Sequence, residues 1–85
     1  MTFEELSNYI NMGNELEFTY DGRNYSITYY YPDENDDNVL ISFCEFYKET
    51  SEVKTPEELW NNISRYDHTV GEMLSSISDD EIRVF

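Results

Sequence analysis

The chain has few basic residues and no alanine. Only 5 lysine and arginine residues accompany 19 aspartate and glutamate residues, so the formal net charge is −14 over 85 residues. Affinity for nucleic-acid phosphates comes from lysine and arginine, and anionic lipid headgroups repel a chain of this charge. We therefore expect no direct binding to nucleic acid and no binding to a membrane surface.

Cysteine and long apolar segments are equally scarce. The single cysteine, Cys44, cannot form an internal disulfide, and the chain does not open with a basic segment followed by an apolar one. No apolar run approaches the roughly 20 residues that a membrane-spanning helix needs. Together these absences predict a protein of the reducing cytoplasm.

Large apolar side chains can supply a core even in a chain this short. Hydrophobic residues make up 39% of the sequence, and aromatic residues alone make up 16%. A chain of this length has room for one core only, and its content of bulky residues disfavours intrinsic disorder. We predict one domain, residues 1–85, which excludes mechanisms that need two domains.

The first third of the chain predicts a helix followed by a β-hairpin. Thr2 and Glu5 have the spacing of a capping box, in which a hydroxyl and a carboxylate satisfy free amide groups, so we expect a helix over Phe3–Met12. Apolar and polar residues then alternate over Leu16–Tyr20, which indicates a strand with one buried face. An Asp-Gly pair typical of a tight turn follows, and the return strand should span Tyr25–Tyr31.

The rest of the chain predicts a third strand and two helices. Residues Val39–Tyr47 are apolar on both faces over much of their length, which favours the central or most covered place in the sheet. The segment Thr55–Glu58 repeats the helix-start signal, and a helical apolar stripe over Val70–Ile77 indicates the last helix. The tail Glu81–Phe85 alternates weakly and predicts a short strand. The fold class is therefore α+β: a helix, a three-stranded antiparallel sheet, two helices on one face of it, and a short C-terminal strand.

One acidic segment, Asp33–Asn38, has some features of a calcium-binding loop. Counting from Asp33, however, the sixth position of such a loop requires glycine and holds Asn38, and the twelfth requires a bidentate glutamate and holds Cys44. We therefore predict no metal site in this segment. Two interpretations stay open: a solvated hairpin loop, and an acidic tip that contacts another protein.

The sequence lacks the residue combinations of common enzyme sites. Its one histidine, His68, and its one cysteine, Cys44, cannot supply three or four soft metal ligands, and neither lies in a catalytic motif. There is no glycine-rich phosphate loop and no nucleophile elbow. We predict that the protein is not an enzyme and binds no cofactor. We also expect Cys44 to be a small buried hydrophobe and His68 to be exposed.

Three consecutive tyrosines, Tyr29, Tyr30 and Tyr31, end the second predicted strand beside the acidic segment. Because side chains alternate across a strand, at least one of the three must face away from the helix-covered core. An exposed tyrosine offers a large contact area at low entropic cost, so these residues are candidates for a protein-binding surface. Ordinary strand propensity is the alternative explanation.

The negative charge is spread along the whole chain. Residues 1–22, 23–47, 48–68 and 69–85 have net charges of −5, −4, −2 and −3. A compact chain of this length is roughly 30 Å across, and duplex DNA displays about 18 phosphate charges over that length. The charge density of this chain and that of duplex DNA are of the same order. The net charge of the chain exceeds what solubility requires. Carboxylates held rigidly by a fold can therefore occupy a basic groove built for nucleic acid.

In size, charge, tyrosine content and element order, the chain resembles small acidic inhibitors from phages and mobile elements. These include anti-CRISPR proteins that block the PAM-reading groove of Cas9. The resemblance implies a DNA mimic in the bacterial host cytoplasm, which binds the basic nucleic-acid-binding groove of a nuclease such as Cas9 or of another defence protein. In those inhibitors, acidic loops and strand edges contact arginines of the target. The corresponding residues here, by position, are Asp33, Glu34, Asp36 and Asp37 in the acidic segment, and Glu15 and Glu17.

Two other functions fit the same residues. The chain can be a small acidic protein-interaction module of a bacterium or mobile element, with a charge that serves solubility and a tyrosine-rich strand that mediates assembly. It can also be an immunity-type inhibitor that fills the active site of one basic toxin. The oligomeric state stays open.

Overall fold

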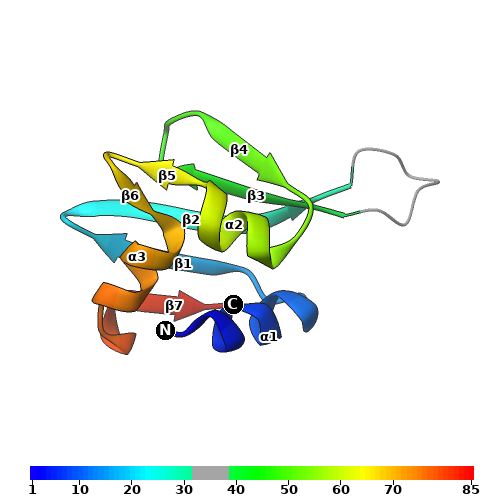
Figure 1. Ribbon diagram of the computed structural model, residues 1–85, viewed down its shortest axis with the longest axis horizontal. Coiled ribbons are helices and arrows are strands. Elements are labelled where there is room, and N and C mark those ends of the chain that lie inside the picture. The colour runs from blue at the N-terminus through cyan, green and yellow to red at the C-terminus, as the bar shows by residue number, and fades with distance from the viewer. Residues whose placement is uncertain (32–38) are drawn as a thin grey trace.

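The computed structural model describes residues 1–31 and 39–85, which form three α-helices, one 3₁₀ helix and seven strands (Figure 1). In chain order the elements are α1 (Phe3–Asn11), β1 (Leu16–Tyr20), β2 (Arg23–Tyr30), β3 (Leu40–Glu45), β4 (Thr50–Val53), α2 (Pro56–Asn62), β5 (Ser64–Arg65), β6 (His68–Thr69), α3 (Val70–Ser76), η1 (Asp79–Glu81) and β7 (Ile82–Val84). The α+β class predicted from the sequence is confirmed.

Five strands form one antiparallel sheet in the order β4-β3-β2-β1-β7. The predicted three-stranded sheet is its centre, and the predicted C-terminal strand is confirmed as β7, which pairs with β1. The strand β3 lies in the interior of the sheet, as its two apolar faces predicted, although β2 is the middle strand. The other two strands, β5 and β6, form a separate hairpin.

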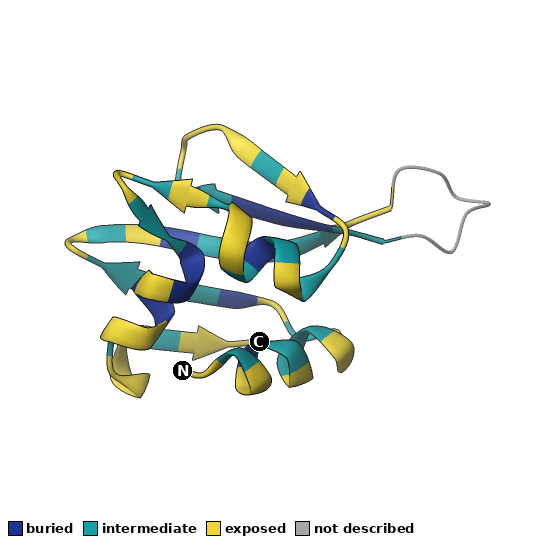
Figure 2. Ribbon diagram, in the orientation of Figure 1, coloured by how far each residue is buried: buried dark blue, intermediate teal, exposed yellow. Residues whose placement is uncertain are grey.

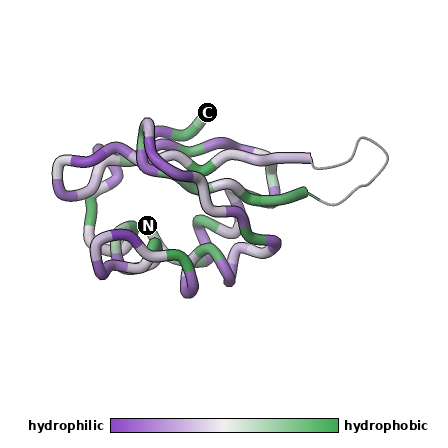
Figure 3. Tube along the Cα trace, turned by 90° about the horizontal axis from the view of Figure 1, so that it is seen from above, coloured by the Kyte–Doolittle hydropathy of each residue, from purple (hydrophilic) through white to green (hydrophobic). Residues whose placement is uncertain are grey.

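The three α-helices form a layer on one face of the sheet (Figures 1 and 3). Between the layers, the rings of Phe18, Tyr25 and Phe43 stack, with centroids 5.2 Å apart in the first pair and 5.5 Å apart in the pair Tyr25–Phe43. All three residues are buried, as Figure 2 shows for the central strands. The indole of Trp60 on α2 joins the helices, because it packs edge-on against Phe3 of α1 at 5.7 Å and lies against Gly71 of α3.

The opposite face of the sheet is covered by no helix of the described chain. Small polar side chains, including Ser26 and Thr28, lie there half-buried. Cys44 shares this face, and its sulfur lies 3.2 Å from Ser26 Oγ. The prediction of a buried Cys44 was therefore wrong: the thiol is only half-buried, because strand alternation directs it away from the helix layer.

The boundaries of the predicted strands shift by two residues at two turns. The hairpin turn places Asp21 and Gly22 at φ 51° and 77°, so Tyr20 pairs directly with Arg23 and β2 begins two residues earlier than predicted. The strand β3 ends at Glu45, before the predicted Tyr47, because Tyr47 adopts φ 68° in the following turn.

Two further parts of the fold were not predicted. The strand β4 is mostly polar and becomes a strand by pairing with β3. The β5–β6 hairpin turns through Tyr66 and Asp67, at φ 52° and 68°, where the sequence offers no glycine. This hairpin replaces the helix connection expected around His68. The expected exposure of His68 is confirmed only in part: its side chain is 45% accessible, and β6 holds its ring edge-on to Tyr20 at 5.4 Å.

Candidate functional site

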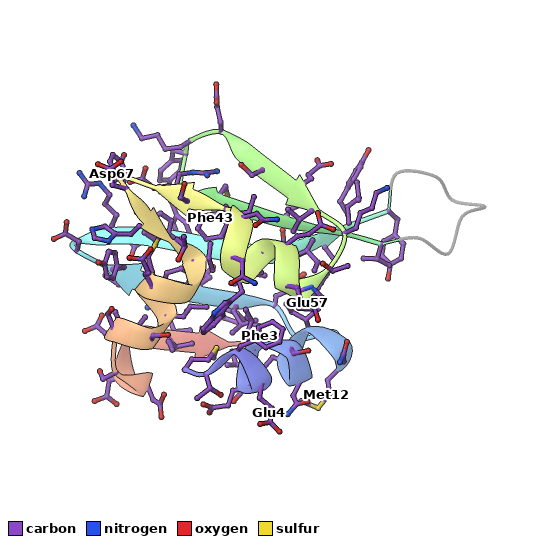
Figure 4. All side chains as sticks on the ribbon, viewed as in Figure 1. Phe3, Glu4, Met12, Phe43, Glu57 and Asp67 are labelled. Atoms are coloured by element: carbon purple, nitrogen blue, oxygen red, sulfur yellow. The ribbon has the colours of Figure 1, made fainter. Side chains whose placement is uncertain are left out.

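The helices of the described chain carry acidic residues and no basic ones. The acidic residues are Glu4 and Glu5 in α1, Glu57 and Glu58 in α2, Glu72 in α3, and Asp79, Asp80 and Glu81 in η1. We call the outer surface formed by these eight residues the acidic helix face. All are exposed except Glu58, which is half-buried, and Figure 4 labels Glu4 and Glu57 among them. The helices thus carry a net charge of −8.

The packing of the three α-helices brings their five acidic residues onto the helix-covered side of the sheet. The helix α2 packs against both α1 and α3, with Trp60 at the junction. The short helix η1 lies against β1 and β7, and its Asp79 shares one shallow depression of about 180 Å³ with Glu5 of α1, which connects η1 to this surface. The charge of the acidic helix face is therefore held by packed elements.

Two of the carboxylates are fixed in capping boxes. The backbone N–H of Thr2 donates to Glu5 Oε1 at 3.0 Å, and the N–H of Glu5 donates to Thr2 Oγ1 at 3.2 Å. At the start of α3, the N–H of Thr69 donates to Glu72 Oε1 at 3.2 Å, and the N–H of Glu72 donates to Thr69 Oγ1 at 3.1 Å. The hydrogen bond from each threonine N–H is the main cause that lowers the pKa of Glu5 and of Glu72. Both groups are therefore ionised at neutral pH.

Helix stability explains part of this arrangement. The helix dipole favours carboxylates in the first turn, where Glu4, Glu57 and Glu72 lie. The same dipole favours cations in the last turn, yet none of the three α-helices has a basic residue there. Capping and the dipole account for acids at the helix starts, but they do not account for the lack of any helical cation.

All five basic residues lie in strands or in segments next to them. Arg23 lies 3.5 Å from Asp21 and 3.4 Å from Glu45, and Arg83 lies 3.5 Å from Glu17. Outside the helices, the described chain has seven acidic residues against five basic ones, a net charge of −2. The sheet and its turns are therefore nearly neutral, and most of the described negative charge belongs to the helices.

The residues predicted as a binding surface do not all belong to one place. Asp33, Glu34, Asp36 and Asp37 lie outside the described residues. Glu17 lies on the face of β1 without helices, where Arg83 of β7 neutralises part of its charge. Glu15 precedes β1 and is exposed beside a cavity near the end of α1.

The three consecutive tyrosines separate as strand alternation requires. Tyr29 faces the helix side, where its hydroxyl donates to the carbonyl oxygen of Asn14. Burial, together with the negative charge of Glu15, raises the pKa of Tyr29 to about 12, so its hydroxyl stays protonated. Tyr30 and Tyr31 are 50% and 64% exposed. Two tyrosine rings are thus available to a partner at this end of the sheet.

A cavity of about 550 Å³ opens at this end, between the helix layer and the sheet. Its walls come from the end of α1, the end of β2, the start of β3 and the segment between β4 and α2. Ile10, Tyr29, Tyr31 and Ile41 supply much of the apolar surface. Among the described residues that line it, the charged groups are Glu15 and Lys54.

The described part of the chain offers no assembled metal site. No group of three or more histidine, cysteine, aspartate or glutamate side chains in residues 1–31 and 39–85 is placed to hold a metal ion. His68 instead lies with its Nδ1 3.8 Å from Glu72 Oε2, while the nearest polar partner of the Cys44 sulfur is Ser26. Among the described helices, none is long and apolar enough to cross a membrane.

Comparison of the chain with protein-family models, with curated proteins and with solved structures finds no match. The function is therefore inferred from the residues of this chain alone.

Sequence reasoning did not single out the acidic helix face. The sequence does contain an indication of this surface, because every lysine and arginine falls outside the three segments with helical spacing. The acidic segment Asp33–Asn38 was predicted as the contact surface instead, because most of its residues are acidic and adjacent in the sequence. The carboxylates of the three α-helices come onto one side of the sheet only when these helices pack together.

Proposed function

We propose that this protein is a non-enzymatic inhibitor that binds the basic nucleic-acid-binding groove of a bacterial nuclease or defence protein by DNA mimicry. The observation that carries the proposal is the acidic helix face, with its eight carboxylates and no cation. DNA also presents closely spaced negative charges on a stiff scaffold. A groove lined with arginine and lysine would attract both surfaces at long range.

The structure favours the helices as the contact surface within its described part. Glu17, proposed by resemblance, is already paired with Arg83 and offers a partner less free charge. The helical carboxylates have no lysine or arginine within ion-pair distance among the described residues. Binding would therefore give these groups their first lysine or arginine partners.

Two pieces of helical geometry support mimicry by ionised groups. The capping boxes hold Glu5 and Glu72 in place and lower their pKa, so neither carboxyl takes up a proton near neutral pH. The helices also fix the backbone positions of the other six residues. A preorganised charge array loses less conformational entropy on binding than a disordered acidic tail does.

A second candidate is the small acidic interaction module, in which charge serves solubility. The observation that favours it is the set of exposed aromatic residues on the strands and turns: Tyr30, Tyr31, Tyr47 and Tyr66. Such a module would bind through apolar contact, and its affinity would depend weakly on salt. An inhibitor that uses the acidic helix face would instead lose affinity steeply as salt rises.

The proposal is tested by affinity capture from a bacterial lysate followed by binding measurements on the captured protein. The captured partner should be displaced by added duplex DNA. The helix-face variant Glu4→Gln/Glu57→Gln/Asp80→Asn should then bind that partner at least about 10-fold more weakly than the wild-type chain in calorimetry at low salt.

The control variant Glu49→Gln/Glu52→Gln/Asp67→Asn removes the same charge from exposed positions on strands and turns. Its affinity should fall less than about threefold. Equal losses in the two variants would show that only net charge matters. A partner that DNA does not displace, with unchanged affinity for the helix-face variant, would favour the interaction module.

A further inference from the structure

The fold already binds one arginine side chain of its own, Arg23. This contact lies at the opposite end of the sheet from the cavity beside Glu15. At that other end, Arg23 Nε lies 3.4 Å from the carboxylate of Glu45, and the Arg23 guanidinium stacks 4.0 Å above the ring of Tyr66. The Tyr66 hydroxyl completes the set by donating to Glu45 Oε2 at 2.9 Å. A carboxylate and a tyrosine ring thus hold one guanidinium group on the helix-covered side of the sheet.

The cavity contains the same combination of groups without the arginine. Glu15 supplies a carboxylate, and Tyr29 and Tyr31 supply two rings. No lysine or arginine of the described chain forms an ion pair with Glu15. The effect of Glu15 on the pKa of Tyr29 agrees with this arrangement, because it requires the carboxylate to lie near the tyrosine hydroxyl.

Among the described residues that line the cavity, Lys54 is the cation. Lys54 follows β4, whereas Glu15 precedes β1, and these strands are three positions apart in the sheet. Three strand spacings separate the two backbones by about 14 Å. Among the described residues, Lys54 forms no ion pair with Glu15.

We propose that this cavity receives an arginine side chain from a protein partner. The methylene groups of the arginine would lie against Ile10 and Ile41, the guanidinium would bind the Glu15 carboxylate, and Tyr31 would contribute a cation–π contact. The volume of about 550 Å³ is ample for one such side chain. The net charge of −14 favours a basic occupant over an acidic one. This cavity is separate from the acidic helix face, and its occupation does not require binding there.

The test is an NMR titration of the isotope-labelled chain with N-acetyl-L-arginine amide. We expect saturable shifts of the amide signals of Gly13, Glu15 and Tyr31, with a dissociation constant on the order of 1 mM. The variant Glu15→Gln should bind at least about fivefold more weakly, and Tyr31→Leu about threefold more weakly.

Two controls separate this site from general attraction by a negative chain. Glu17→Gln removes a carboxylate two residues away, on the other face of β1, and should leave the affinity within about twofold of wild type. N-acetyl-L-norleucine amide, which has a linear apolar side chain and no charge, should bind at least about fivefold more weakly than the arginine compound. Equal binding of the two compounds, or equal effects of Glu15→Gln and Glu17→Gln, would overturn the proposal whatever the acidic helix face binds.

Discussion

Gly71 is the residue that lets α3 lie against the indole of Trp60. A Cβ atom at this position would lie 2.5 Å from Trp60 Nε1 and 2.7 Å from Cε2. Such separations are well inside van der Waals contact, so either the indole or the helix would have to move. Because Trp60 also packs against Phe3, its displacement would loosen the contact between α2 and α1. One glycine thereby affects the relative position of all three helices.

Overpacking costs about 1–3 kcal/mol in other cores, and the better helix propensity of alanine offsets about 1 kcal/mol of it. We therefore expect Gly71→Ala to lower the free energy of unfolding by about 1 kcal/mol, and by about 2 kcal/mol at most. Urea unfolding followed by circular dichroism measures the change. Ser75→Ala, an exposed position of the same helix, should be neutral or slightly stabilising. A Gly71→Ala chain as stable as wild type would show that the indole moves at no cost.

At the scale of the element, each capping box couples a helix start to pH. The pKa of Glu72 is lower in the folded chain than its ordinary value of 4.5. A carboxyl group with a lowered folded-state pKa stabilises the fold at pH values above its unfolded pKa. That contribution is lost as the pH falls through the lower, folded-state value. Acid therefore weakens the start of α3 by protonating one identified group.

We predict that Glu72→Gln is less stable than Glu49→Gln at neutral pH. Both substitutions remove one negative charge, but only Glu72 places that charge in the first turn of a helix, where it accepts a charge-assisted capping hydrogen bond that glutamine accepts more weakly. The difference in free energy of unfolding between the two variants should narrow from about pH 5 to about pH 2, because Glu72 becomes neutral in that range. Urea unfolding at several pH values provides the measurement. A difference that stays constant with pH would contradict the assigned function of this carboxylate.

Elements with local signals were predictable from the sequence. The box of Thr2 and Glu5 predicts the first helix, and the Asp21-Gly22 pair predicts the first hairpin; both are present. The strand β4 was missed because its stabilisation comes from pairing with β3, which no alternation within Thr50–Val53 reveals. The β5–β6 turn was missed because its first left-handed residue is Tyr66, a type that rarely adopts this conformation, and no glycine accompanies Asp67.

The candidate surface was less predictable than the fold. Glu17 meets Arg83 only because β7 pairs with β1, a contact between residues 66 apart in the sequence. The cavity beside Glu15 likewise combines residues from both layers, which no spacing in the sequence brings together. What the sequence did predict is the sign and amount of charge, since these depend on composition alone.

At the scale of the whole molecule, repulsion among carboxylates opposes folding. The described residues contain three ion pairs between arginine and a carboxylate, against a formal net charge of −14 for the chain. Salt screens repulsion and attraction alike, and in this chain the repulsion is stronger than the attraction. Screening should therefore stabilise the fold while it weakens binding to a basic partner.

We expect the free energy of unfolding to rise with ionic strength, by on the order of 1 kcal/mol between about 0.02 and 0.5 M sodium chloride. Unfolding by urea at each salt concentration is suitable, because urea itself adds no charge. The helix-face variant with three neutralised carboxylates should show a smaller rise than wild type. A free energy of unfolding that falls with salt would mean that the ion pairs outweigh the repulsion.

The negative charge of the described residues is distributed unevenly between helices and strands. With −8 on the helices and −2 on the rest of the described chain, the described part has an electric dipole moment whose negative end lies on the helix side. The field of a cationic groove exerts a torque on such a dipole before the two surfaces touch. Collisions would then begin with the helices already turned toward the groove, and a larger fraction of them would be productive.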